Sequence, residues 1–533
     1  MAFRRLRSVT SEQTAAAEAE RQREERERAR AMIQAQIEAS ASRFRELLEA
    51  RLASGLPSSP EQLLELEREV HQIVAKECVD PVMGVVIQEA HDSPAVAERA
   101  DELLRRRPYL YLQDSSATVG VDLLGGSTVR IRSPYYLQRP PRRAGRPRKR
   151  GRRGKAGNGL YPGLAVLGIH YHLTPAFASD VSRLTVMSTA QEAVETLRLR
   201  GIKVDRKKVL ALTGQLARRG LEYRKWLQEQ GAANKQRTSG GLKGRRLVIG
   251  TDGGRVRLRF PRRGRPRKSG RRGFNPEWKE PKVVIIYEID AQGKKVDKGI
   301  LRYDATMQDA DGTFAILVAM LIELGAHEAL EWIIVGDGAG WIWGRIKKLV
   351  DAVGYDVDKV TEVVDWFHAV EHLHGIADLL TGVTPKERKA WEKQMKTLLH
   401  NGKIDELISA IKVAARGSKN AKNIRKGTHY FKTHRERLQY KTFKSKSIPI
   451  GSGAVESCVR RVVNLRMKGN GIFWEPSNAE DMLHLRAQLL CGRWHSYVTT
   501  ILQPKEFWVS CSAKVAPSDR KPRQITTPLR KAA

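Results

Sequence analysis

The chain has 533 residues, enough for several domains, and 41% of them are hydrophobic. Its 96 Lys and Arg residues exceed its 59 Asp and Glu residues, and the formal charge of +37 favours a polyanionic partner, nucleic acid before an acidic membrane surface. The sequence lacks an apolar run of about 18 residues, a signal-peptide core and a CxxC pair, which disfavours a membrane protein, a disulfide scaffold and a zinc cluster. We therefore expect a soluble, reduced, intracellular protein.

The N-terminal region, residues 1–122, is predicted to be all-helical. Apolar residues share one helical face between positions 33 and 48, and this face either packs on a partner or stays solvated. A second helix is predicted to begin at Ser59-Pro60, because Ser caps a helix and Pro suits its first turn.

A basic linker is predicted at residues 123–159, which contain no acidic residue. Its run Arg139–Gly154 cannot bury apolar area and is expected to become ordered only when it binds phosphate groups. Residues 160–242 should be helical, with two helices separated near residues 201–205. These helices form either a DNA-binding helix-turn-helix or an ordinary basic helical hairpin.

An α/β core is predicted from residue 243. Its mixed five-stranded sheet should use residues 247–251, 255–260, 283–289, 332–336 and 360–364, with helices covering the sheet. The first part of the core is 243–365, an all-α insertion follows at 366–449, and the core resumes at 450–495. A basic tail occupies 496–533.

Three acidic residues lie in distinct settings around this core. Asp252 and Asp337 each end a short apolar strand, and Glu456 opens a helix after the glycine loop Gly451-Ser-Gly453. Together they could hold a pair of divalent ions roughly 4 Å apart, which clamp the attacking and leaving oxygens of a phosphodiester. Taken singly, each is better interpreted as an ordinary carboxylate at a strand end or helix start.

Four motifs in this order resemble those of DDE transposases. They are Thr251-Asp-Gly-Gly-Arg255, Gly336-Asp-Gly-Ala-Gly-Trp-Ile-Trp343, Asp365-Trp-Phe-His368 and Gly451-Ser-Gly-Ala-Val-Glu-Ser457. The layout is similar to that of the ISKra-type group of bacterial insertion sequences, itself similar to Mutator-like transposases. The likeness runs from about residue 160 to 494, and no single motif of the set is specific.

The resemblance implies a ribonuclease H-like core in which Asp252, Asp337 and Glu456 are catalytic and bind metal, two Mg²⁺ or Mn²⁺ ions. It implies that the substrate is double-stranded DNA, both the transposon ends and the target. It also implies a prokaryotic protein that is cytoplasmic and associated with the nucleoid. A homo-oligomer is expected because two ends must be brought together. The rival functions are a metal-dependent endonuclease on the same fold and a transposase-derived DNA-binding protein without activity.

Accessory roles are predicted for Asp365, His368 and Arg460. Asp365 and His368 either act directly or serve as a helix cap and a packed ring. His368 and His372 share a helix face, but no Cys completes a zinc site. Arg460 lies one turn from Glu456, where it could hold the scissile phosphate or balance the acids.

Two basic repeats resemble AT-hooks, whose arginines enter narrow minor grooves. The alternative is a linker that only neutralises phosphates. Trp474 could stack on an unpaired base, or belong to the core. The predicted DNA contacts are Arg146 and Arg148 in the first repeat, Arg263, Arg265, Arg267 and Lys268 in the second, and Arg461, Lys468 and Trp474 near the last acid.

Overall fold

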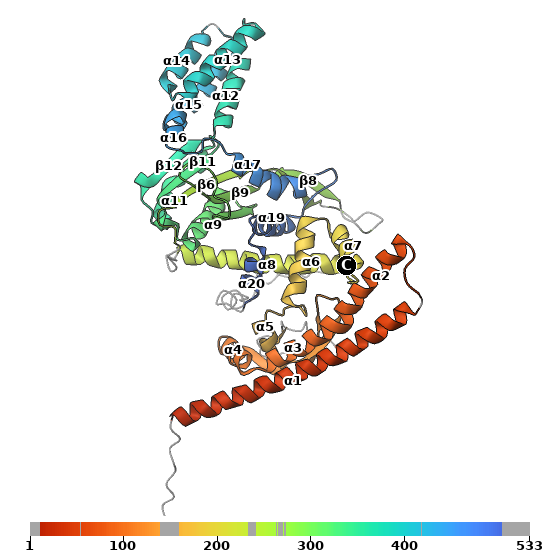
Figure 1. The fold of residues 1–533 in the computed structure, drawn as a ribbon. Coiled ribbons are helices and arrows are strands. Elements are labelled where there is room, and N and C mark those ends of the chain that lie inside the picture. Colours follow the sequence, from red (N-terminus) through yellow and green to blue (C-terminus); the bar gives the residue numbers. More distant parts are fainter. Residues whose placement is uncertain are drawn as a thin grey trace, which may run out of the picture. The chain divides into compact units, whose positions relative to one another are not determined.

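The computed structural model describes the chain except residues 1–10, 54, 139–158, 233–240, 263, 265–269, 271–272, 417 and 504–533. Its contacts divide the chain into two units (Figure 1). The first contains residues 1–180, 194–205 and 499–533, and the second contains 181–193 and 206–498. None of the helices in the described ranges is both long and apolar enough to cross a membrane.

The first unit begins with helices, as predicted. Ser59 caps the second of them by accepting a hydrogen bond from the backbone N–H of Gln62, which confirms the predicted helix start. The long first helix packs on the third and on the π-helical turn before it. These elements are α1 (Ser11–Leu52), α2 (Pro60–Ile73), η1 (Val74–Val79), α3 (Asp80–Asp92) and α4 (Pro94–Arg105).

Strands follow from Leu110, so the prediction of an all-helical region to residue 122 is wrong. They are β1 (Leu110–Asp114), β2 (Thr118–Asp122), β3 (Thr128–Arg132), β4 (Tyr135–Gln138) and β5 (Gly159–Leu160). The β2–β3 hairpin alternates buried and exposed residues, and this period of two outweighs the helical context. The buried Asp80 holds the hairpin turn by accepting hydrogen bonds from Gly125 and Ser127.

The predicted linker 123–159 is therefore partly sheet, and only its residues 139–158 lie outside the described chain. Residues 160–232 are mainly helical, as predicted, with α5 (Pro162–Val166), α6 (Pro175–Met187), α7 (Ala190–Leu199) and α8 (Arg206–Ala232). Most of α8 packs on other helices of the second unit. Its first turn, Arg206 to Lys208, is exposed, and a DNA-binding role for these helices stays a prediction.

The second unit contains the predicted mixed five-stranded sheet. Its order is β10 (Leu301–Thr306), β9 (Lys282–Ile289), β6 (Arg246–Gly253), β11 (Glu331–Gly336) and β12 (Val360–Val364). The first three strands are antiparallel, and β11 and β12 run parallel to β6. The central strands are continuous apolar runs because helices bury both faces.

One predicted strand of this sheet lies elsewhere. Residues 255–260 form β7 (Val256–Pro261), which pairs with β8 (Phe274–Lys279) in a separate hairpin and makes an isolated bridge from Leu258 to Trp474. Its alternating charged residues leave one face exposed, which suits a two-stranded arm better than a buried sheet. β10 takes the fifth place and was not predicted.

Helices cover the sheet and form the insertion. The helices that contact the sheet are α9 (Ala310–Glu323), α17 (Gly453–Val459) and α19 (Pro476–Leu490). Between α17 and α19 the chain forms the π-helical η5 (Arg460–Asn464) and the short α18 (Leu465–Met467). The short helices α10 (Gly340–Trp343) and α11 (Ile346–Val353) follow β11, and α20 (Trp494–Leu502) ends the described chain. The helical insertion is confirmed as α12 (Trp366–Asp378), α13 (Pro385–His400), α14 (Ile404–Ala414), α15 (Ala421–Thr433) and α16 (Tyr440–Ser445), and Figure 1 shows α12 to α15 as one group.

Candidate metal centre

Three aspartates lie in register at the carboxyl ends of three adjacent parallel strands. Val335 of β11 pairs with Gly250 of β6, and Gly336 pairs with Val364 of β12. Continuing both registers places Asp337 beside Asp252 on one side and beside Asp365 on the other. The backbone N–H of Asp365 donates to the Gly336 carbonyl at 2.9 Å, which extends the β11–β12 pairing to this level. The sheet thus sets a row of carboxylates along one edge.

The electrostatics of Asp252 join it to this row. Burial raises the pKa of its carboxyl, and the negative charge of Asp337 raises it further. The Gly253 N–H, 2.6 Å from Oδ1, and His368 oppose the rise. A cation that binds between two such carboxylates favours their ionised forms, because its positive charge offsets both the burial and the mutual repulsion.

The Asp337 loop is held on both sides. Its Oδ1 accepts a hydrogen bond from the Ala339 N–H at 3.0 Å, and its carbonyl accepts one from the Trp343 indole at 2.8 Å. At Gly338 a Cβ atom would lie 2.0 Å from the ring of Tyr430 on α15. The glycine after the aspartate is therefore required by the close approach of the helical insertion.

Asp365 positions its neighbours through both carboxylate oxygens. It is fully buried, and its Oδ1 accepts a hydrogen bond from the Phe367 N–H at 2.5 Å, which caps α12. Its Oδ2 accepts one from the Ser452 N–H at 2.7 Å. This second bond ties the glycine loop before α17 to the end of β12, so Asp365 fixes the start of the helix that carries Glu456.

Glu456 is exposed on α17, and close packing against β6 sets the distance between that helix and the sheet. At Gly250 a Cβ atom would lie 2.4 Å from Val455, the residue before Glu456. The ligand atoms of Asp365, His368 and Glu456 all lie within 4.8 Å of one another. No other trio of His, Cys, Asp or Glu meets this spacing in the described ranges.

The structure therefore brings Glu456 nearest to Asp365 and His368, and the predicted trio with Asp252 and Asp337 is not assembled at ligand spacing. Both sets belong to one cluster, because Asp252 interacts with Asp337 and with His368. Carboxylate oxygens are ligands that suit Mg²⁺ or Mn²⁺, whereas an imidazole is a ligand more typical of transition metals. The residues whose ligand atoms lie close enough for one divalent ion are Asp365, His368 and Glu456, and Asp365 also accepts two backbone hydrogen bonds.

The hydroxyl of Tyr430 was not singled out in the sequence. It is a buried oxygen without a hydrogen-bond partner in the described part of the chain. Burial raises the pKa of Tyr430, and the charges of Asp337 and Asp365 raise it further. The ring stacks on His372 at 3.7 Å between centroids. Tyr430 is 93 residues after Asp337, so no local pattern could connect the two.

The predicted DNA contacts, and the accessory residue Arg460, lie in different parts of the chain. Arg460 and Lys468 are exposed after Glu456, and Arg461 interacts with Tyr303 on β10. Trp474 is half-buried: its indole N–H donates to the Met467 carbonyl at 3.1 Å, and Arg466 lies over its ring. These contacts give Trp474 a packing role, and base stacking remains a prediction. Outside the described residues lie Arg146, Arg148, Arg263, Arg265, Arg267 and Lys268.

The second basic repeat nevertheless has a defined base, since it joins β7 to β8. Arg257 of β7 lies 5.4 Å from the ring centroid of Trp278 on β8, and Trp278 is 59% exposed. Trp278 is thus an exposed aromatic side chain on the strand after the repeat, and Arg257, on the strand before it, is half-buried and donates to the Gly469 carbonyl.

Comparisons with protein-family models, with curated proteins and with solved structures found no match to this chain.

Proposed function

We propose that the protein is a DDE-type DNA transposase that cuts transposon ends and joins them to target DNA. The observation that carries this proposal is the row of Asp252, Asp337 and Asp365 in register at the sheet edge, with Glu456 and His368 beside it. The five-stranded mixed sheet is compatible with a ribonuclease H-like core. The net charge of +37 supports a nucleic-acid substrate.

Divalent ions of the Mg²⁺ type, held by the carboxylates of Asp252, Asp337, Asp365 and Glu456 with His368 beside them, would stabilise the attacking and leaving oxygens of phosphodiester transfer. The chain itself supplies the placement. Asp365 holds the loop before α17, and the Gly250 contact seats that helix against β6. Arg460, exposed one turn after Glu456, can bind a non-bridging phosphate oxygen of the DNA.

Transposition requires two DNA ends in one complex, so a homo-oligomer on nucleoid DNA of a prokaryotic cell is part of the proposal. The test uses the full chain, Mg²⁺ or Mn²⁺, a target plasmid and duplexes from the DNA that borders its own coding sequence. We expect cleavage at the borders and joined products, both abolished by EDTA. Cleavage without joining would identify an endonuclease instead. Tight binding without cleavage would identify a DNA-binding protein.

A further inference from the structure

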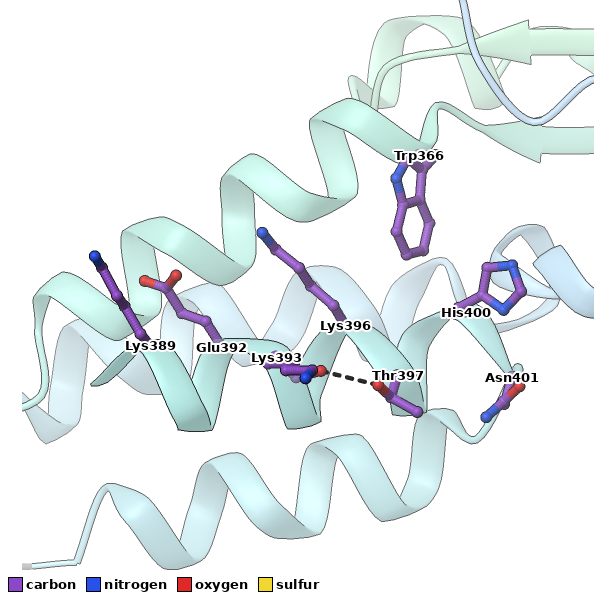
Figure 2. Close-up of a pocket in the computed structure, with 8 residues that line it drawn as sticks. All are labelled: Trp366, Lys389, Glu392, Lys393, Lys396, Thr397, His400 and Asn401. Carbon is purple, nitrogen blue, oxygen red and sulfur yellow. Dashed lines mark hydrogen bonds between the residues drawn. The ribbon is translucent and has the colours of Figure 1, made fainter. Parts of the chain in front are cut away.

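The helical insertion carries a basic groove outside the candidate metal centre. It has a volume of about 420 Å³ and runs along α13 beside α12 (Figure 2). Its lining residues are Trp366, Lys389, Glu392, Lys393, Lys396, Thr397, His400 and Asn401. In Figure 2 the side chains of Lys389, Glu392 and Lys396 rise from α13 toward α12, and Trp366 lies above His400.

The cationic residues of the groove form one stripe. The three cations Lys389, Lys393 and Lys396, followed by His400, are separated by three or four residues, which places all four on one face of the helix. The stripe is roughly 16 Å long at about 1.5 Å per residue. That length matches about five base pairs at a rise of roughly 3.4 Å. The spacing suits successive phosphates along a duplex.

The acids near this stripe already have partners. Glu387 closes the capping box with Thr384, and Glu392 lies 3.3 Å from His374 on α12. By contrast, the structure records no ion pair for Lys389, Lys393 or Lys396 in the described part of the chain. Lys389 and Lys393 are exposed, and Lys396 is half-buried. The three ammonium groups are therefore free to meet an anion.

The groove leads to the candidate metal centre. Trp366, at one end, follows Asp365 directly in the chain, and its N–H donates to the Ile450 carbonyl at 2.9 Å. Its ring meets His400 at 5.8 Å and Tyr440 at 5.0 Å, both edge to face. These contacts fix the end of the stripe to the loop that precedes Glu456.

We infer that the α13 stripe binds the phosphate backbone of duplex DNA that extends away from the metal centre. This inference rests on the proposed function, because it assigns a path to the same DNA. A lysine stripe reads charge rather than sequence, so it holds and orients the duplex without selecting bases. An acidic protein segment would satisfy the same charges, but continuity with the metal centre favours the DNA.

The experiment compares two triple variants of the full chain. The groove variant is Lys389→Gln, Lys393→Gln and Lys396→Gln. The control variant is Lys412→Gln, Lys422→Gln and Lys426→Gln, which removes the same charge from exposed positions on α14 and α15. Affinity for a 30-base-pair duplex is measured without metal at several salt concentrations, and circular dichroism with thermal melting checks that both variants fold.

We expect the groove variant to bind about ten- to a hundredfold more weakly near 0.1 M salt. The magnitude of its slope of log K against log salt should fall by about 2.7, because each lost phosphate contact removes roughly 0.9. The control should change the slope by less than about one. Equal losses in both variants, or no loss in either, would overturn the inference.

Binding without metal also separates this inference from the proposed function. If the wild type binds DNA and never cuts it, the proposed function fails while the slopes still decide the role of α13. If the wild type cuts DNA and the groove variant keeps its full slope, the groove inference fails alone. A wild type that does not bind duplex DNA contradicts both.

Discussion

Two acidic clusters of the second unit use similar residues in opposite ways. Asp304 on β10 is 3% exposed, yet it contacts Arg224 at 3.4 Å and His484 at 2.9 Å. Tyr497 completes the cluster through the other ring nitrogen of His484 at 2.9 Å. At the sheet edge, no Lys or Arg in the described ranges pairs with Asp252, Asp337, Asp365 or Glu456.

The pKa shifts follow the same division. Burial alone would raise the pKa of Asp304, but His484 and Arg224 outweigh it and the pKa is lowered. Burial and Asp337 together leave the pKa of Asp252 raised. A carboxylate whose charge is balanced inside the protein belongs to the fold. Carboxylates without an internal cation are available to an external one.

The largest effect is expected from substitutions in the acidic cluster at the sheet edge. Asp337→Asn, Asp252→Asn and Glu456→Gln should each lower DNA cleavage by roughly a thousandfold or more, since each removes a metal-binding oxygen. DNA affinity without metal and the melting temperature should remain close to those of the wild type. The reason is that no Lys or Arg side chain in the described ranges would lose its partner when one of these acids is replaced. A variant that keeps substantial cleavage would remove its residue from the site.

The opposite behaviour is expected at the buried cluster. Arg224→Met should lower the free energy of unfolding by about 3–5 kcal/mol, because it leaves Asp304 buried without one of its cations. Urea unfolding measures the loss, and Lys225→Met, at an exposed position of the same helix, should change it by less than about 0.5 kcal/mol. Equal small effects would contradict the structural role given to the Asp304 cluster.

A smaller effect is expected at Asp481, beside the buried cluster. Burial raises the pKa of its carboxyl to about 6, and Glu480 adds to the rise. A raised folded-state pKa contributes stability that is full below the unfolded value near 3.9 and is lost as the pH rises through about 6. Asp481→Asn should therefore stabilise the protein by roughly 1–2 kcal/mol at pH 7 and by little at pH 4.

Thermal melting at the two pH values checks the Asp481 prediction. A variant that is less stable at pH 7 would show that Asp481 is ionised and paired in the folded protein. Asp304 should behave in the other sense, since its lowered pKa gives stability that is lost as the pH falls through the folded value.

The sequence predicted the strands that carry Asp252, Asp337 and Asp365 because each is a short apolar run that ends at an acid. It could not show that the three ends share one level, since register depends on pairing between strands about 30 to 85 residues apart. The β2–β3 hairpin was missed although its alternation was present, and β7 was placed in the wrong sheet. Ser452 lies in a predicted motif, but its bond to Asp365 and the approach of Tyr430 to Asp337 carry no local signal, because only tertiary packing brings these residues together.

The proposed metal site is tested most directly by Mn²⁺ binding to the purified full chain, followed by the loss of the free-ion electron paramagnetic resonance signal. The wild type, the double variant Asp252→Asn with Asp337→Asn, and the exposed control Asp358→Asn are titrated in the presence of duplex DNA. The metal-site proposal predicts that the double variant loses the tightest Mn²⁺ binding and that the control retains it. Mn²⁺ binding by the double variant equal to that of the wild type would contradict the proposal.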